Sequence, residues 1–339
     1  MKELNFEYNG LKINSHAKKT RAAIVALSKN DEIYQIARTM EQIEDRFNGK
    51  FQYDWVFFNN EEFTPQFKNL TSAMASGKVK FGVIPKKFWS YPDWIDQDKA
   101  AETRKKMGEQ GIRYGDLESY RHMCRFKAGL MFQMEELKEY DWYWLVEPRV
   151  DFTCNIDYDV FEFMEKNNKL YGFSIAFSEM METVETFWDS SMEFLKKHPD
   201  AKDKESFFEF LTDDNGKTYN GNHYWSNFEV GDLNFFRSNA YMKYFDYMDR
   251  AGGFYYERWG DGPLHTFAAS TFIPRDKLHF FDDIGYKHEA WETCPISEKH
   301  RLKQKCSCDP RSDYRVGGPK PWIDYYNLMG MEYPDFGKV

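Results

Sequence analysis

The 339-residue sequence lacks two features that would place it in a membrane or on nucleic acid. A membrane-spanning helix needs about 18 or more consecutive apolar residues, and the sequence has no such window. Lys and Arg number 46 against 55 Asp and Glu, which gives a net charge of −9, and no basic block stands out. Because nucleic-acid-binding proteins usually carry a basic patch, we expect no nucleic-acid partner.

Glycine-rich phosphate-binding motifs are also absent. Neither G-x-G-x-x-G nor G-x-x-x-x-G-K-[ST] occurs, so nothing indicates dinucleotide-binding or P-loop chemistry. Residues 1–20 are polar and contain no hydrophobic segment typical of a signal peptide. The sequence therefore predicts either a cytosolic protein or a chain that lacks its membrane anchor.

Cysteine is scarce, and three of the five cysteines lie close together near the carboxyl end. Cys306 and Cys308 are separated by one residue, too few for the usual zinc-binding C-x₂₋₄-C spacing. We predict instead a disulfide from Cys294 to Cys306 or Cys308, which favours an oxidising compartment. The other two cysteines are Cys124 and Cys154. Because the total is odd, at least one of the five cysteines has no disulfide partner within the chain.

Aromatic residues are abundant, at 19% of the chain. Aromatic side chains bury large areas, so most of them are expected in the core. The surplus could line a cleft for a sugar, because the apolar faces of pyranose rings stack on aromatic rings.

The first third of the chain has the pattern of alternating strands and helices. Residues 21–27, 53–58 and 78–84 are predicted strands, and apolar residues at helical spacing lie between them. Thr64 and Pro65 are typical of a helix start. This order predicts a parallel sheet with right-handed crossovers.

Lys29 and Asn30 directly follow the first predicted strand. Ligands of open parallel sheets bind at the carboxyl ends of the strands, so both residues are expected to face a nucleotide.

The remaining helices and strands have less regular patterns. The patterns predict helices at 96–109, 117–139, 158–167, 183–197, 205–212 and 239–250 and one ending near 271, strands at 140–146, 170–176, 224–237 and 278–283, and little structure after 294.

Six polar side chains are candidates for chemistry. Glu147 and His288 each come just after a predicted strand, where a catalytic or metal-binding group is expected, although Glu147 could merely bond neighbouring backbone. Asp261, Asp282 and Asp283 are metal-ligand candidates of the same grade. Glu229 stands in an apolar, aromatic strand, and a buried carboxylate must be paired or functional unless it faces solvent.

Five sequence blocks together resemble one known family. They are SYRHMCRF at 119–126, EP at 147–148 followed by CNIDYDVF at 154–161, WSNFE at 225–229, GGFYYERWGD at 252–261 and DIGYKH at 283–288. These blocks are long, ordered and similar to those of the fungal GDP-mannose α-1,2-mannosyltransferases, glycosyltransferase family 15, over residues 21–295.

The resemblance implies an α/β fold of the GT-A-like type. A Rossmann-like nucleotide-binding half, with a mixed central sheet, is expected to continue into an α+β acceptor half. Residues 1–20 would be the remnant of a stem, 21–295 the catalytic domain and 296–339 a tail packed on it. The full-length protein would be a type II membrane protein of the Golgi lumen, with its anchor outside this chain.

The resemblance also implies a reaction. The enzyme would transfer α-mannose from GDP-mannose, with retention, to the 2-hydroxyl of a mannose-terminated acceptor on O- or N-linked glycans. A manganese ion beside the diphosphate would contact Glu147 and His288. Glu229 would be the nucleophile, or would stabilise positive charge at C1 in a front-face route. Tyr120 would lie near donor and acceptor. Apart from what the resemblance implies, we predict that Lys29, Asn30, Trp225, Asp261 and Arg149 bind the donor.

The sequence departs from the family pattern near this site. The family strand WRVEPD reads WLVEPR here, with Leu145 in place of an arginine and Arg149 in place of an aspartate, and an arginine-histidine pair is replaced by Gln133-Met134. Arg149 could weaken cation binding, could pair with phosphate, or could have no effect on the site. Two other functions therefore stay open: mannosylphosphate transfer, and an inactive protein that binds mannan or the nucleotide sugar.

Overall fold

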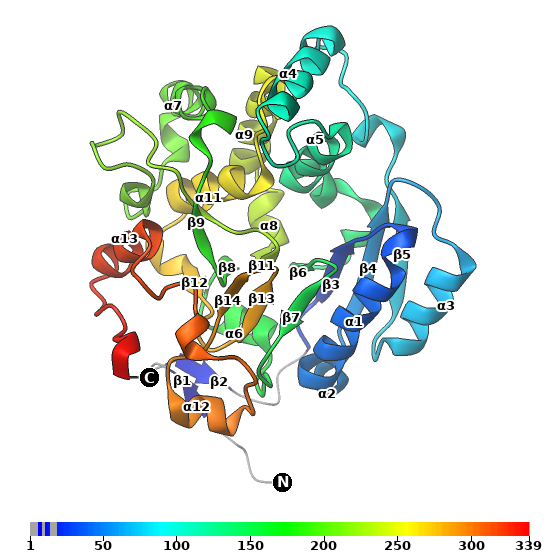
Figure 1. Cartoon of the computed structure of the whole chain (residues 1–339), viewed down its shortest axis with the longest axis vertical. Coiled ribbons are helices and arrows are strands. Elements are labelled where there is room, and N and C mark those ends of the chain that lie inside the picture. Colours follow the sequence, from blue (N-terminus) through cyan, green and yellow to red (C-terminus); the bar gives the residue numbers. More distant parts are fainter. Residues whose placement is uncertain (1–5, 9–10, 14–18, 339) are drawn as a thin grey trace.

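A mixed seven-stranded sheet forms the centre of the protein, with helices packed on both of its faces (Figure 1). The computed structural model describes residues 6–8, 11–13 and 19–338. In spatial order the strands are β12 (Leu278–Phe280), β8 (Tyr171–Phe173), β11 (Phe228–Asp232), β6 (Trp142–Val146), β3 (Ala22–Leu27), β4 (Asp54–Asn59) and β5 (Val79–Val83). Strands β6, β3, β4 and β5 are parallel, whereas β11 runs antiparallel to both of its neighbours. The predicted α/β fold with a mixed sheet is confirmed.

Most helices begin where the sequence predicts them, because their caps are local. Thr64 accepts a hydrogen bond from the backbone N–H of Phe67, and Asp96 accepts from those of Asp98 and Lys99. The helices are α1 (Ile33–Ile43), α2 (Gly49–Phe51), α3 (Pro65–Met74), α4 (Gln97–Glu109), α5 (Glu118–Arg125), α6 (Val160–Lys166), α7 (Phe187–Lys197), α8 (Leu233–Phe236), α9 (Asn239–Ala251), α10 (Gly253–Tyr256), α11 (Asp261–Phe272), α12 (Glu298–Lys303) and α13 (Lys320–Leu328).

The predicted long helix 117–139 is wrong in its second half. After α5 the chain forms a π-helical turn, Phe126–Leu130, and then short 3₁₀ turns. Gly129 lies against the ring of Phe245, and a Cβ atom there would come within 2.4 Å of that ring. This close packing explains the glycine, and π-helical turns are frequent at functional sites. The turn carries Lys127, which reaches the cleft described below.

The predicted strand 224–237 is also divided. Strand β10 (Asn222–Tyr224) pairs with β9 (Ala176–Ser178) in a separate sheet, and β11 begins only at Phe228. After Asp232 the chain turns into α8, because the Asp232 side chain accepts from the N–H of Asn234 and caps that helix. The residues between β10 and β11 consequently form a loop at the amino end of β11 and are not part of the main sheet.

A three-stranded sheet supplies the other side of the site. Its order is β14 (Trp291–Thr293), β13 (Tyr286–His288) and β7 (Val150–Phe152), and His288 lies opposite Val150. Gly285 precedes β13 where a Cβ atom would lie 2.2 Å from the hydroxyl of Thr153, so only glycine permits this close approach. The pairing of β7 with β13 brings residues 147–149, which directly precede β7, close to the segment 283–288.

The carboxyl-terminal segment is more ordered than its sequence predicts. Helix α13 buries Trp322 completely, with its ring 4.4 Å from that of Phe280 at the sheet edge. The predicted division at residues 20 and 295 stays a prediction, and most of the predicted stem lies outside the described residues. Strands β1 (Phe6–Tyr8) and β2 (Leu11–Ile13) form an antiparallel pair. Within the described ranges, no helix is long and apolar enough to cross a bilayer.

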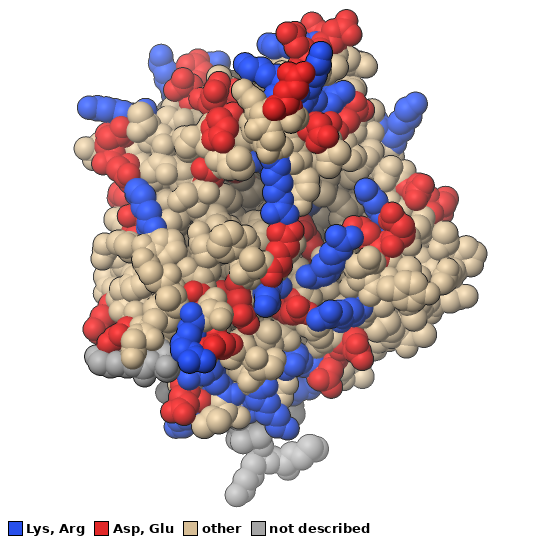
Figure 2. All heavy atoms as spheres, in the orientation of Figure 1, with Lys and Arg blue, Asp and Glu red and all other residues tan. Residues whose placement is uncertain are grey.

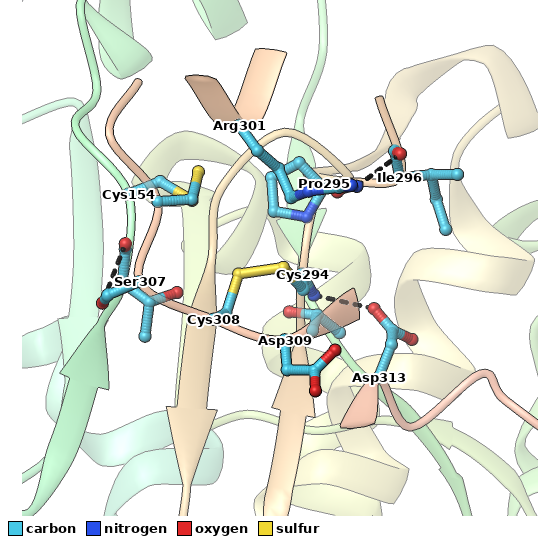
Figure 3. Close-up of a disulfide and its surroundings, with 12 residues drawn as sticks. Cys154, Cys294, Pro295, Ile296, Arg301, Ser307, Cys308, Asp309 and Asp313 are labelled. Carbon is cyan, nitrogen blue, oxygen red and sulfur yellow. Dashed lines mark hydrogen bonds between the residues drawn. A yellow bond between two sulfur atoms is a disulfide. The ribbon is translucent and has the colours of Figure 1, made fainter. Parts of the chain in front are cut away.

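Two disulfides fasten the three-stranded sheet to the chain that follows it. Cys294, directly after β14, bonds Cys308, which confirms one of the two predicted pairings (Figure 3). Cys154, just after β7, bonds Cys306, a pairing that the sequence analysis missed because these residues are 152 positions apart. Cys124 is a free, buried thiol.

We expect peptide mapping without reduction to recover Cys154–Cys306 and Cys294–Cys308 as linked pairs. Loop-closure entropy predicts that replacing both cysteines of the first pair by serine lowers the free energy of unfolding by about 5 kcal/mol, and of the second by about 3 kcal/mol. Denaturant unfolding measures both values. Recovery of four free thiols from the described pairs would contradict the assignment.

Candidate active site

A cleft of about 510 Å³ opens at the carboxyl ends of β3, β4 and β6. Its surface is mixed in charge, and basic and acidic side chains are also interspersed over the face shown in Figure 2. The residues that line it are Leu27, Ser28, Lys29, Glu32, Asn59, Asn60, Trp89, Arg113, Tyr114, Leu117, Ser119, Tyr120, Met123, Lys127, Glu147, Pro148, Arg149, Glu179, Met180, His223, Trp225, Ser226, Asn227, Arg258, Gly260, Asp261, Gly262, Pro263, His288 and Glu289. Seven of the nine site residues expected from the sequence are in this set; Asn30 and Glu229 are not.

Lys127 lies between two carboxylates in the cleft. Its Nζ is 2.8 Å from Oε1 of Glu147 and 3.0 Å from Oδ2 of Asp261. Burial would lower the pKa of Lys127, but the two carboxylates outweigh it and raise the pKa above its ordinary value. Lys127 therefore remains charged. The sequence analysis missed it, because a lysine in a helical segment gives no signal of its own.

Asp261 is held from two sides at the start of α11. Besides Lys127, the hydroxyl of Ser226 donates to its Oδ2 over 2.7 Å. Burial opposes ionisation, yet Lys127 and then His265 and Ser226 lower the pKa of Asp261. The carboxylate is thus a fixed negative charge in the cleft wall, close to the first turn of a helix.

His288 is oriented by its neighbours on the β10–β11 loop. Its ring stacks on Trp225, with centroids 5.0 Å apart, and its Nδ1 is 2.7 Å from the side-chain nitrogen of Asn227. Burial lowers the pKa of His288, although the charge of nearby Glu147 acts in the opposite direction. The imidazole is consequently neutral at physiological pH, the form that binds metals.

The residues present fit a divalent cation. The side-chain oxygen of Asn227 is buried without a partner. Rotating this amide by 180° would pair that oxygen with Nδ1–H of His288 and leave Nε2 free for a metal. Glu147, with its side chain 25% exposed, adds a carboxylate oxygen. Manganese accepts such oxygen and imidazole ligands.

These two ligands are few, so nucleotide phosphates and water would complete the coordination. In the part of the chain that the structure describes, the one group of three or more donor atoms within 4.8 Å is Cys154, Cys306 and Cys308, whose sulfurs belong to disulfides. No site built from protein ligands alone competes with the cleft there.

Tyr120 and Arg258 form a further part of the cleft wall. Nη1 of Arg258 donates to the Tyr120 hydroxyl over 3.2 Å, and Nη2 is 3.6 Å from the carboxylate of Glu179. The Tyr120 ring stacks on Tyr114 at a centroid distance of 4.7 Å. Burial raises the pKa of Tyr120 well above 10, so it remains a neutral phenol. The sequence analysis found Tyr120 and missed Arg258 and Glu179.

Arg149 lies in the cleft in a conformation that arginine rarely adopts. Its φ is 72°, in the left-handed region that Asp and Asn enter more readily, which accounts for the aspartate usual in the family. Its side chain is exposed and, among the described residues, makes no hydrogen bond or ion pair. Arg149 also acts on the carboxylate of Glu289. The hydrogen bond from Arg113 lowers the pKa of Glu289, burial opposes this, and the charge of Arg149 lowers the pKa further.

Two residues predicted from the sequence to act at the site, Asn30 and Glu229, do not line the cleft. The Asn30 amide donates to the carbonyl of Glu62 over 2.9 Å and its oxygen accepts from the N–H of Thr64, so it fixes a loop and does not line the cleft. Lys29, its neighbour, does line the cleft.

Glu229 is completely buried. Its carboxylate accepts hydrogen bonds from the hydroxyls of Tyr143 and Tyr171, the latter over 2.7 Å, and lies 2.8 Å from Nδ1 of His265. Leu145 stands directly opposite on β6. The arginine usual in the family at position 145 would be beside this carboxylate, and here tyrosines and a histidine surround it instead.

Comparison with known proteins decides the family. The sequence profile of the family described as glycolipid 2-alpha-mannosyltransferase matches residues 4–329. The chain belongs to this family. The family and enzyme class predicted from the sequence, a mannosyltransferase, are thereby confirmed.

Individual relatives and solved structures agree with this. The chain is 50% identical to glycolipid 2-alpha-mannosyltransferase 2 of Candida albicans, covering 93% of this chain and 68% of the relative. It is 48% identical to alpha-1,2 mannosyltransferase KTR1 of Saccharomyces cerevisiae, covering 93% and 80%. It resembles the crystal structure of core-mannan synthase A from Aspergillus fumigatus in its Mn/GDP form, with a TM-score of 0.86, 39% identity and coverage of 94% and 87%.

We predict that His288→Ala weakens Mn²⁺ binding in the presence of GDP by about tenfold or more, because it removes one of two protein ligands. The fold should be unchanged, since His288 ends a short strand near the surface of the cleft. Electron paramagnetic resonance of Mn²⁺ measures the binding, and His198→Ala, outside the cleft, is the control. Unaltered Mn²⁺ affinity in His288→Ala would remove His288 from the metal site.

Proposed function

We propose that the cleft binds GDP-mannose together with manganese and transfers α-mannose, with retention, to the 2-hydroxyl of a mannose acceptor. The observation that carries this proposal is the convergence of Glu147 and His288, from distant segments, on one cleft of a chain in the mannosyltransferase family. The Mn/GDP form of core-mannan synthase A, a solved relative, supports the choice of metal and nucleotide.

Departure of GDP requires the negative charge of the diphosphate to be stabilised. A bound divalent cation would supply Lewis-acid stabilisation of that charge. Four cationic side chains of the cleft can add to it: Lys29, Arg113, Lys127 and Arg149. Of these, Arg149 is the one that follows the metal-binding strand end directly, and its exposed guanidinium is suited to bidentate phosphate binding. We propose that it binds the diphosphate.

The wall formed by Tyr120 and Arg258 suits the acceptor. The neutral phenol of Tyr120 can exchange hydrogen bonds with a sugar hydroxyl, and Arg258 fixes its orientation. The aromatic rings of Tyr114 and Trp225 are also available to a pyranose ring.

The geometry favours a front-face route over a covalent one. A nucleophile must approach the anomeric carbon to about 3–3.5 Å, and Glu229, fully buried and with three partners, does not line the cleft. Its role as nucleophile stays a prediction that would require the cleft floor to open. In the front-face route the acceptor oxygen attacks C1 as the C1–phosphate bond breaks, and its proton passes to the departing phosphate oxygen. Glu229 would then stabilise positive charge at C1 from below.

One experiment tests the function. The protein is incubated with GDP-mannose and α-methyl-mannoside, with and without Mn²⁺, and the product is identified by mass spectrometry and NMR. We expect an α-1,2-linked dimannoside that depends on Mn²⁺. A phosphodiester product would indicate mannosylphosphate transfer, and binding of GDP-mannose without turnover would indicate an inactive, binding member of the family.

The cellular setting is also a proposal. Two disulfides favour an oxidising compartment, which agrees with work in the Golgi lumen on O- or N-linked glycans and with an anchor outside the cleft-bearing part of the protein. Immunolocalisation of the full-length protein tests this.

We predict that Glu229→Gln lowers kcat by about 100-fold or more, because it removes a negative charge below the reacting carbon. Glu229→Ala supplied with azide should give no mannosyl azide, since in the front-face route no nucleophile attacks C1 from the face opposite GDP and azide has no such role to take over. Turnover and product analysis measure both effects, and thermal unfolding shows whether the buried substitution is tolerated. Mannosyl azide of inverted configuration would establish the covalent route instead, and near-normal turnover by Glu229→Gln would exclude either role.

A further inference from the structure

Lys127 forms an ion pair with Glu147, the carboxylate proposed to bind the metal. Its ammonium lies 2.8 Å from Oε1 of Glu147, and its side chain is only 4% exposed. A divalent cation at Glu147 would stand next to this ammonium, and two cations on one carboxylate repel each other. Binding of a metal at Glu147 therefore requires Lys127 to move or to be compensated by added negative charge.

A second anchor allows Lys127 to move without leaving the cleft. Asp261, 3.0 Å from the same ammonium, is itself fixed by Ser226 and by the start of α11. The backbone of Lys127 is fixed in the π-helical turn Phe126–Leu130, which packs against Phe245. The flexible four-carbon stem can thus swing while one carboxylate still holds the charged end.

We propose that Lys127 is a placeholder for the metal: it neutralises Glu147 before ligands bind and passes to the nucleotide diphosphate when metal and nucleotide bind together. The proposal rests on the proposed function, since it assumes a metal-diphosphate complex at this cleft. Its consequence is ordered binding, in which free metal binds poorly and the metal-nucleotide complex binds well.

This arrangement predicts opposite effects on two ligands. Lys127→Met removes the competing cation, so Mn²⁺ alone should bind about tenfold more tightly. The same change removes a phosphate partner, so GDP in the presence of saturating Mn²⁺ should bind about tenfold more weakly. A residue that only supports the fold would weaken both.

The test measures Mn²⁺ affinity without nucleotide by electron paramagnetic resonance and GDP affinity by calorimetry. Lys127→Arg keeps the charge and should leave Mn²⁺ affinity low, and Lys169→Met, a lysine outside the cleft whose ammonium binds the carbonyl of Asp276, is the matched control. Unchanged or weaker binding of Mn²⁺ alone by folded Lys127→Met would overturn the proposal.

A second variant covers the case in which Lys127→Met does not fold. Asp261→Asn leaves Lys127 with Glu147 as its carboxylate partner, so Mn²⁺ alone should bind several-fold more weakly than to the unaltered protein. Tighter binding would overturn the proposal. Turnover of GDP-mannose by the unaltered protein tests the proposed function separately, because neither metal-binding result depends on a transfer reaction.

Discussion

The antiparallel pairing of β11 with β6 brings the two halves of the site together. Phe228, the first residue of β11, stands opposite Val146, the last of β6. The residues just before β11 therefore meet the residue just after β6, which is Glu147. Had β11 run parallel, as the strands on the other side of β6 do, Trp225–Asn227 would lie at the far edge of the sheet. The antiparallel direction of β11 thus places Trp225–Asn227, which orient His288, at the carboxyl ends of the parallel strands.

The charges of the site are arranged so that none is buried alone. Lys127 balances Glu147 and Asp261, and Arg258 lies near Glu179 elsewhere in the cleft wall. A buried charge without a partner lowers the free energy of unfolding. Removing one partner of a buried ion pair therefore destabilises the protein, because the other charge is left uncompensated. In such a network a charged ligand must exchange existing ion pairs for new ones, which is the basis of the ordered binding proposed above.

The departures from the family pattern have separate physical meanings. Leu145 lies in the core directly opposite Glu229, so losing the arginine changes the environment of that carboxylate and leaves the cleft surface unaltered. Arg149 changes the cleft itself, since it places an exposed cation on the cleft surface. The first change alters the surroundings of a buried carboxylate, and the second alters the charge of the cleft.

The sequence by itself determined the parallel strands, the capped helices and the family, because these depend on local periodicity, on caps such as Thr64 and Asp96, and on long motifs. The resemblance to the family predicted that Glu147 and His288 act together, and both line the cleft. Only the tertiary structure decided that Asn30 serves a loop, that Glu229 is buried, that Cys154 bonds Cys306 and that Lys127 bridges two carboxylates. Each of these depends on contacts between segments distant along the chain or on which face of a strand is covered. Alternation along one strand cannot reveal what packs on it, so the depth of Glu229 and the partners of Lys127 came from the packing of the sheet, α11 and the π-helical turn.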